Sequence, residues 1–162
     1  MLKKSLDLGC GFNPNNIFNA DEIYGVDIRD NLGNNILKAD LAIEPIPFES
    51  EFFDFVTAFD FIEHIPRVAY TPHRRNCFVE LMNEIYRVLK IGGSFLSLTP
   101  AYPHAEAFRD PTHVNIITED TLPLYFGSKY RWGSIYGFNG EFEIESQEWR
   151  GPSLLTLMKK TL

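Results

Sequence analysis

Acidic residues and glycines close two short apolar segments near the start of the chain. Leu6-Asp7-Leu8 runs into Gly9-Cys10-Gly11, and residues 22–26 end at Asp27. Glycines at such a turn let the backbone approach a ligand closely, because no Cβ stands in the way. A carboxylate placed like Asp27 can accept hydrogen bonds from both hydroxyls of a ribose. The spacing favours an adenosyl ligand without separating dinucleotides from other adenosyl compounds.

The chain after the glycines departs from the dinucleotide-binding pattern. That pattern expects a third small residue near Pro14, but Asn13-Pro14-Asn15-Asn16 is typical of a turn and not of a helix start. Asp7 lies inside the loop motif, where its charge would repel a pyrophosphate and attract a cationic amino-acid ligand. Further on, Asp40 and the following amide of Leu41 can bind the amino edge of adenine.

A second group of ionisable residues follows the apolar segment 54–59. Asp60, Glu63 and His64 are spaced i, i+3, i+4, so on a helical turn they would share one face. His113 can add a fourth ligand, and this oxygen-rich set suits magnesium or manganese better than zinc. Without a metal, His64 is the candidate general base for a hydroxyl acceptor, or it only packs or caps a helix start.

The elements that would position these residues alternate between strands and helices. Residues 73–90 have helical spacing, and Gly92-Gly93 is a typical helix end. This alternation predicts an α/β fold with a mostly parallel sheet, helices on both faces and ligands at the carboxyl ends of the strands. The late segments 142–149 and 154–158 are joined so closely that they can pair only as an antiparallel hairpin.

Composition narrows the class of protein further. A length of 162 residues predicts one domain, 1–162, and the net charge of −7 disfavours nucleic acid as a partner. No apolar run is long enough to span a membrane, and residues 1–5 are followed by no apolar signal region. Cys10 and Cys77 have no CxxC partner. Together these features predict a cytoplasmic protein without a membrane partner.

Four ordered segments resemble a class I S-adenosylmethionine-dependent methyltransferase of the type 11 group. They are LDLGCG, GVDI, ADLAIEPIPFESEFFDFVTAFDFIEHI and ELMNEIYRVLKIGGSFLSLTP, within roughly residues 5–101. The resemblance implies a Rossmann-like seven-stranded sheet with the last strand antiparallel. It implies roles in binding S-adenosylmethionine, from the methionine part to the adenine and then to the substrate side, for these residues: Asp7, Gly9, Gly11, Asp27, Ile28, Asp40, Leu41, Phe59 and Asp60.

The sequence also departs from this family. The usual third loop glycine is Asn13, and the one or two helices expected before the first strand are missing. We therefore expect a site that is open on one side unless a second subunit of a homo-oligomer covers it. The Asp60, Glu63, His64 and His113 set resembles metal sites of ubiquinone-type O-methyltransferases and of small-RNA 2′-O-methyltransferases, with a shorter acid at its first position.

The resulting hypothesis is methyl transfer to a small-molecule or glycan hydroxyl. The segment Asp110-Pro111-Thr112-His113 resembles one in small methyltransferases found with polysaccharide-building enzymes, which favours a glycan. The aromatic residues in 125–138 would form a wall of the acceptor pocket, or ordinary core. Three alternatives stay open: metal-dependent methylation of an RNA ribose, an NAD-binding oxidoreductase, and a non-catalytic binding protein. The oxidoreductase is disfavoured by the loop and by the lack of a Tyr-x-x-x-Lys hydride-transfer group.

Overall fold

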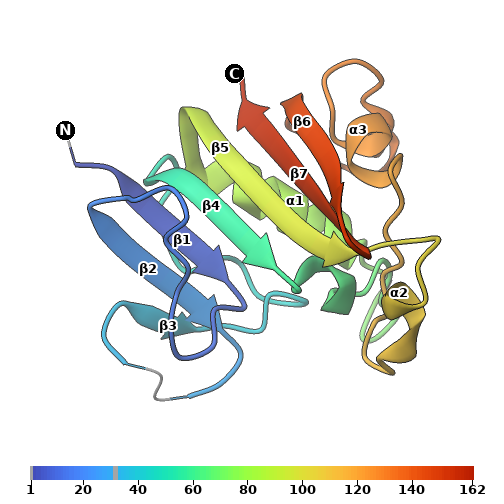
Figure 1. Ribbon diagram of the computed structural model, residues 1–162, viewed down its shortest axis with the longest axis horizontal. Helices are drawn as coiled ribbons and strands as arrows, with labels where there is room; N and C mark the ends of the chain where they lie inside the picture. Colours follow the sequence, from blue (N-terminus) through green and yellow to red (C-terminus); the bar gives the residue numbers. More distant parts are fainter. Residues whose placement is uncertain (1, 31–32) are drawn as a thin grey trace.

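The computed structural model describes residues 2–30 and 33–162, and its centre is a seven-stranded sheet (Figure 1). The strand order is β3-β2-β1-β4-β5-β7-β6. Neighbours among β1 to β5 are parallel, and β7 is antiparallel to both β5 and β6. This confirms the predicted Rossmann-like sheet with its antiparallel hairpin. The strands are β1 (Lys4–Leu8), β2 (Glu22–Asp27), β3 (Ile36–Lys38), β4 (Phe53–Phe59), β5 (Leu89–Pro100), β6 (Phe142–Arg150) and β7 (Ser153–Lys160).

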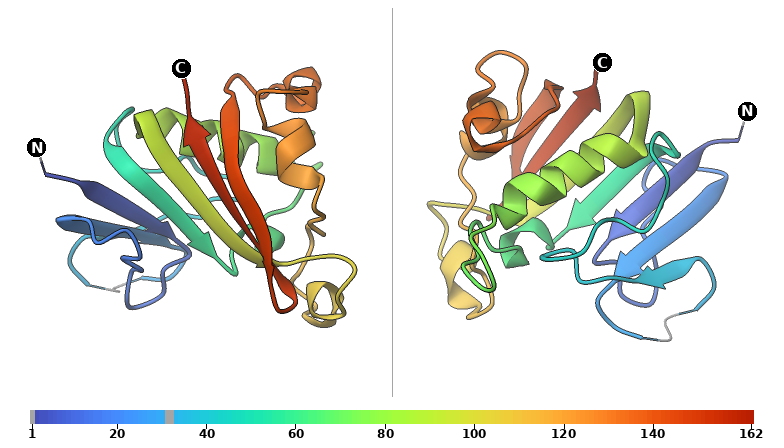
Figure 2. Two further views of the ribbon diagram at one scale, coloured as in Figure 1. Left: turned by 45° about the horizontal axis from the view of Figure 1, so that its top comes forward. Right: turned by 180° about the vertical axis from the view of Figure 1, so that it is seen from behind.

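The longest helix, α1 (Cys77–Val88), crosses one face of this sheet (Figure 2, right). Its buried residues recur every three or four positions, so one apolar stripe faces the strands. This stripe packs against buried side chains of the sheet such as Val56 and Phe95, and together they form the core. The shorter helical elements are η1 (Ile62–His64), α2 (Glu106–Arg109), α3 (Thr121–Tyr125) and η2 (Trp132–Tyr136).

The predicted helix 73–90 was too long at both ends. Ala69 and Arg75 pair as an isolated bridge before α1, so the segment that enters the helix is extended. At the other end Leu89 already pairs with Phe53, so β5 begins where the helix was expected to continue. The predicted stop at Gly92-Gly93 was therefore wrong, and these glycines belong to β5.

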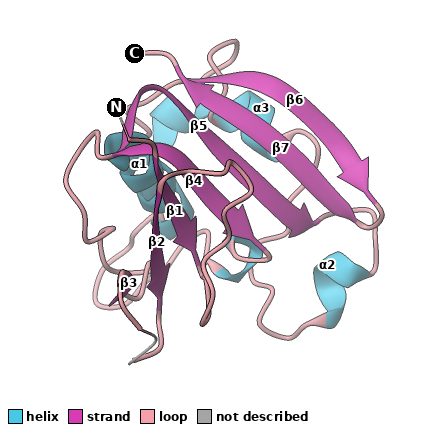
Figure 3. Ribbon diagram, turned by 60° about the vertical axis from the view of Figure 1, so that its left-hand side comes forward, coloured by secondary structure: helices cyan, strands magenta, loops and turns pink. Residues whose placement is uncertain are grey.

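The opposite face of the sheet is covered differently. The connection from β1 to β2 is a loop without helix, and it lies over the strands (Figure 3). Phe18 of this loop stacks on Phe55 of β4, with ring centroids 4.4 Å apart. No helix in the described part of the chain is long and apolar enough to cross a membrane. The carboxyl ends of β1, β2, β4 and β5 meet at one edge, which is where the predicted site residues lie.

Candidate active site at the carboxyl ends of the strands

The glycine turn after β1 has the backbone that glycine permits. Gly9 and Gly11 have φ values of +66° and +60°, in the left-handed region where a Cβ is strained. A Cβ built on Gly9 would lie 2.4 Å from Cδ2 of Phe61. The close neighbour of Gly9 is therefore a protein ring that the sequence analysis did not identify. A contact between this glycine and a cofactor stays a prediction.

Asp7 lies in β1 just before this turn and accepts hydrogen bonds from the loop and from β4. Its carboxylate accepts hydrogen bonds from the Asn15 amide at 2.8 Å and from the Thr57 hydroxyl at 2.6 Å. Burial raises the pKa of Asp7, although both hydrogen bonds act to lower it. The side chain thus ties the loop to β4. Its predicted contact with the methionine part of the cofactor is not tested by these bonds.

Asp27 ends β2 directly beside the same turn. Its Oδ2 accepts a hydrogen bond from the Gly11 amide at 2.9 Å, so the two residues predicted to share a ligand do lie together. Arg29, which the sequence analysis overlooked, also binds this carboxylate through its amide, Nε and Nη2. The side-chain hydrogen bonds from Arg29 outweigh burial and lower the pKa of Asp27 to about 2. Asp27 is therefore a fixed carboxylate anion.

The residues predicted to hold adenine lie after β2 and β3. Ile28 is 59% exposed at the end of β2, so its side chain is free to pack on a ligand. Asp40 begins a turn in which its Oδ1 accepts from the Ala42 amide at 3.1 Å, while Leu41 is buried in the core. The buried side chain of Leu41 thus anchors this turn in the core, whereas Asp40 stays partly exposed.

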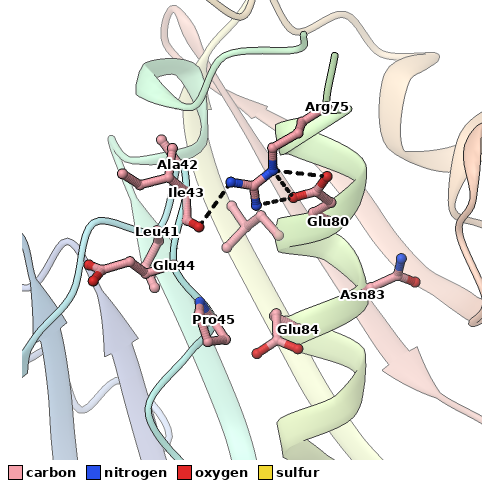
Figure 4. A pocket seen from close by; sticks show the side chains of 10 residues that line it. Leu41, Ala42, Ile43, Glu44, Pro45, Arg75, Glu80, Asn83 and Glu84 are labelled. Carbon is pink, nitrogen blue, oxygen red and sulfur yellow. Dashed lines mark hydrogen bonds and ion pairs between the residues drawn. The ribbon is translucent and has the colours of Figure 1, made fainter. Parts of the chain in front are cut away.

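Arg75 secures that turn against α1. Its Nη1 donates to the Ile43 carbonyl at 3.1 Å, and its guanidinium pairs with Glu80 of α1 (Figure 4). A cavity of about 270 Å³ lies between the turn and the helix, lined partly by these residues. The ion pair positions residues 41–45 and, through them, the neighbouring Asp40.

Asp60, directly after β4, does not lie on the helical turn predicted for it. Asp60 is exposed and has a φ of +46°, and its amide donates to the Leu98 carbonyl at 2.8 Å. The helical turn η1 begins only at Ile62, so Asp60 does not share a helical face with Glu63 and His64. The shared helical face predicted to bring Asp60 to the metal ligands is therefore wrong, whereas the predicted contact of Asp60 with the cofactor stays a prediction. Phe59, half-buried before Asp60, stays a candidate for lining the methionine end.

The other three residues of the predicted set do come together. Glu63, His64 and His113 each offer one ligand atom, and these atoms lie within 4.8 Å of one another. Glu63 is 1% exposed, and its Oε2 accepts from the Thr99 hydroxyl at 2.8 Å. Its Oε1 has no hydrogen-bond partner among the described residues and lies 4.0 Å from Nε2 of His113. Burial raises the pKa of Glu63.

Hydrogen bonds assign the proton on both imidazoles of this cluster. His113 Nδ1 lies 3.2 Å from the Ala107 carbonyl, which can only accept, so Nδ1 carries the proton. His64 Nδ1 lies 3.0 Å from the Thr112 hydroxyl, and that hydroxyl donates to Asp110 at 2.7 Å. Thr112 therefore accepts from His64, and in neutral rings Nε2 of both histidines keeps a free lone pair.

The aromatic segment contributes both to the core and to the wall of a cavity, and a role of this cavity in holding the acceptor stays a prediction. Phe126 and Phe138 belong to the buried core. Tyr125, Phe126 and Tyr136 also line a cavity of about 390 Å³ that reaches Arg67. Arg67 in turn donates to Asn115 at 2.7 Å, and the Asn115 amide donates to the backbone of Glu63 at 3.0 Å. Hydrogen bonds through Arg67 and Asn115 thus link the wall of this cavity to Glu63.

A seven-stranded sheet of this order, with a glycine turn after β1 and an acid at the end of β2, matches the fold of solved S-adenosylmethionine-dependent methyltransferases. A sequence model described as "Methyltransferase domain" matches residues 6–97, and the chain belongs to this family. The protein is accordingly a methyltransferase by family, and the family implies S-adenosylmethionine as its cofactor. A comparison with curated proteins found no match.

Solved structures share the fold at low identity. A SAM-dependent methyltransferase from Methanosarcina mazei has a TM-score of 0.67 and 16% identity, covering 98% of this chain and 92% of its own. One from Archaeoglobus fulgidus has a TM-score of 0.64 and 18% identity, covering 98% and 86%. The [4+2]-cyclase SpnF also has a TM-score of 0.64, with 16% identity over 99% and 75%. These similarities show a common fold and leave the acceptor to be argued from the site.

Proposed function

We propose that the protein transfers a methyl group to a hydroxyl of a small molecule or glycan. The observation that carries the proposal is the cluster of Glu63, His64 and His113 just beyond the carboxyl end of β4. Ligands of open α/β sheets bind at this edge, so the cluster would adjoin a cofactor bound there. A hydroxyl must lose its proton as it accepts a methyl group, and the cluster supplies groups that can take it.

The cofactor side of the proposal uses the residues around the glycine turn. S-adenosylmethionine brings an already activated methyl group, so the protein mainly has to align the reactants. Asp27 would hold the ribose, Ile28 and Asp40 the adenine, and the turn at Gly9 and Gly11 the methionine part. These groups fit such a ligand, because a buried anion, a close backbone turn and an exposed apolar side chain lie beside one another.

His64 is the proposed general base. Its Nε2 has a free lone pair, and its Nδ1–H is held by Thr112. Thr112 in turn donates to the Asp110 carboxylate, so the chain of hydrogen bonds orients the ring. When His64 takes a proton, the nearby Asp110 charge stabilises the imidazolium.

A divalent cation at the same cluster is the alternative to His64 as base, because the Nε2 lone pair of His64 cannot bind a cation and take a proton at the same time. The buried Oε1 of Glu63 lacks a donor among the described residues, and both histidines offer Nε2 lone pairs. Without Asp60 the set is one carboxylate and two imidazoles, which suits manganese or zinc better than magnesium. Bonds of about 2.1 Å place two ligands at most about 4.2 Å apart, so the side chains would have to close slightly. A bound cation would lower the pKa of an acceptor hydroxyl.

Methylation of an RNA ribose is the second candidate. The cation-binding cluster favours it, whereas the net charge of −7 opposes binding to a phosphate backbone. A small or neutral acceptor does not meet this repulsion. We therefore favour the small-molecule or glycan hydroxyl.

The test is methyl transfer from labelled S-adenosylmethionine to a panel of sugars, glycans, small alcohols and RNA, with manganese, with zinc and with EDTA. We expect a hydroxyl compound to be labelled and His64→Gln to slow its labelling by about 10²- to 10⁴-fold. His73→Gln, at an exposed histidine before α1, is the matched control. Labelling that is indifferent to EDTA would remove the cation, and labelling that is indifferent to His64→Gln would remove the base. Labelling of RNA alone would overturn the acceptor class.

A further inference from the structure

The Asp27 carboxylate has no free position for a ligand in this structure. A carboxylate offers about four lone-pair sites. Oδ2 accepts from the Gly11 amide at 2.9 Å and from Arg29 Nη2 at 3.1 Å. Oδ1 accepts from the Arg29 amide at 3.0 Å and from Arg29 Nε at 2.8 Å. Every site is thus already taken by an N–H group of the protein.

Only two of these four donors can leave without moving the backbone. The Gly11 amide belongs to the glycine turn, and the Arg29 amide follows directly from β2. The guanidinium of Arg29 is different, because its side chain is 53% exposed and is held by its ion pair with Asp27. The exposed ring of Phe12, with its centroid 5.4 Å from Arg29 Cζ, offers a neighbouring surface for the displaced group.

We propose that the Arg29 guanidinium occupies the place of the ribose hydroxyls on Asp27 and must be displaced when the cofactor binds. The inference rests on the proposed function only in taking Asp27 as the ribose-binding residue. Two ribose hydroxyls can replace the two guanidinium N–H donors one for one, while the two amide donors stay. Arg29 is thus an internal competitor that sets the affinity for the cofactor.

The guanidinium also lies against the glycine turn. A Cβ built on Gly11 would meet Nη2 of Arg29 at 3.2 Å, so the side chain lies over the turn as well as on Asp27. Displacing Arg29 therefore uncovers both the carboxylate and the backbone that are predicted to contact the ligand. The competition concerns the whole ribose end of the site.

The test is calorimetric binding of S-adenosylhomocysteine to the parent protein, Arg29→Gln and Arg29→Lys. This ligand is a zwitterion without net charge, so losing one positive charge has little direct effect on it. We expect Arg29→Gln to bind about 3- to 30-fold more tightly, because a charge-assisted pair no longer has to break. Arg29→Lys keeps the charge but not the two-point geometry, so its affinity should lie between those of the parent protein and Arg29→Gln.

A matched control is available in the same chain. Arg150 binds Glu148 two residues before it through Nε and Nη2, on β6, and four strands of the sheet separate β6 from the strand of Asp27. Arg150→Gln should leave the affinity unchanged. The gain in Arg29→Gln should recur with 5′-methylthioadenosine, which carries the ribose without the amino acid.

The outcomes separate this inference from the proposed function. Binding by the parent protein that Arg29→Gln weakens or leaves unchanged overturns the competition and keeps the cofactor site. A gain that is lost with 5′-methylthioadenosine also overturns it, because Arg29 would then act on the amino-acid part. No binding of S-adenosylhomocysteine by the folded parent protein overturns the cofactor site itself, and the competition with it.

Discussion

At the residue scale, three carboxylates near one edge of the sheet have pKa values shifted in two opposite directions. Asp27 is kept ionised, with a pKa of about 2, by the hydrogen bonds from Arg29. Burial instead raises the pKa of Asp7 and of Glu63, in spite of the hydrogen bonds that each accepts. Asp27 is suited to accept hydrogen bonds from neutral hydroxyls, whereas Glu63 is suited to a proton or a cation.

Replacing Glu63 by Gln should stabilise the protein in the absence of added metal. A buried carboxylate without a full set of donors is costly, and an amide of the same shape removes the charge. Because burial raises the pKa of Glu63 in the folded state, the stability of the parent protein should fall as pH rises above the ordinary glutamate range. We expect Glu63→Gln to raise the free energy of unfolding at pH 7 by about 1 kcal/mol, measured by urea denaturation.

The control for this change is Glu49→Gln, at an exposed position. It should leave stability within about 0.5 kcal/mol of the parent. A Glu63→Gln protein that unfolds more easily than the parent would show that the ionised carboxylate stabilises the fold and would contradict the account of its burial.

Sequence patterns predicted which candidate site residues lie together, but not the side chains that contact them. The closeness of Gly11 and Asp27 could be predicted, because the ends of adjacent parallel strands meet at one edge. Arg29 and Phe61 were missed, since nothing in a spacing pattern says which exposed side chain folds back over its neighbour. The available signal was the position of Arg29 as a basic residue two positions after the acid that ends β2, close enough to form an ion pair with it.

At the element scale, one carboxylate at the amino ends of the strands ties three of them together. Asp54 of β4 binds Lys3 Nζ at 2.8 Å, the Lys4 amide of β1 at 3.0 Å and Lys90 Nζ of β5 at 2.8 Å. Burial by itself would raise the pKa of Asp54, but these hydrogen bonds outweigh it and lower the pKa to about 2. The strands that carry the site are thus braced at the opposite end.

Asp54→Asn should therefore destabilise the sheet. We expect a loss of about 1–2 kcal/mol in the free energy of unfolding at pH 7, since the lysine partners are partly exposed and the ion pairs partly screened. A folded-state pKa below the unfolded value near 4 means that the contribution is present above about pH 4 and lost as pH falls toward 2. Urea denaturation across this range measures both effects.

Asp30→Asn is the comparison for that experiment, because Asp30 pairs with Lys38 where both side chains are largely exposed. Its effect should be small at every pH. Equal losses in the two variants, or a loss in Asp54→Asn that persists at pH 2, would contradict the bracing role.

Elements were predicted better than their ends. Alternating apolar strands and the tight connection at Gly151-Pro152 specify the parallel sheet and its antiparallel hairpin. The turn at 60–64 and the limits of helix 73–90 were wrong, because local spacing does not reveal a left-handed Asp60 or the pairing of Leu89 with Phe53. Both errors occur where tertiary contacts override local preference.

At the scale of the whole molecule, the two faces of the sheet are covered unequally. Helix α1 covers one face, while a loop lies over the other at the β1–β2 side (Figure 2). The glycine turn and Asp27 lie at the edge next to this loop. A second subunit that closes the open side stays a prediction.

The most direct test of the whole account is calorimetric titration of S-adenosylhomocysteine and, separately, NAD into the parent protein and Asp27→Ala. We expect binding of S-adenosylhomocysteine, none of NAD, and a loss of roughly 1.5–3 kcal/mol in the binding free energy of Asp27→Ala, the range for hydrogen bonds to a charged group. Asp30→Ala, an exposed acid nearby, should bind like the parent. Binding of NAD instead, or an unchanged affinity in a folded Asp27→Ala protein, would contradict the account.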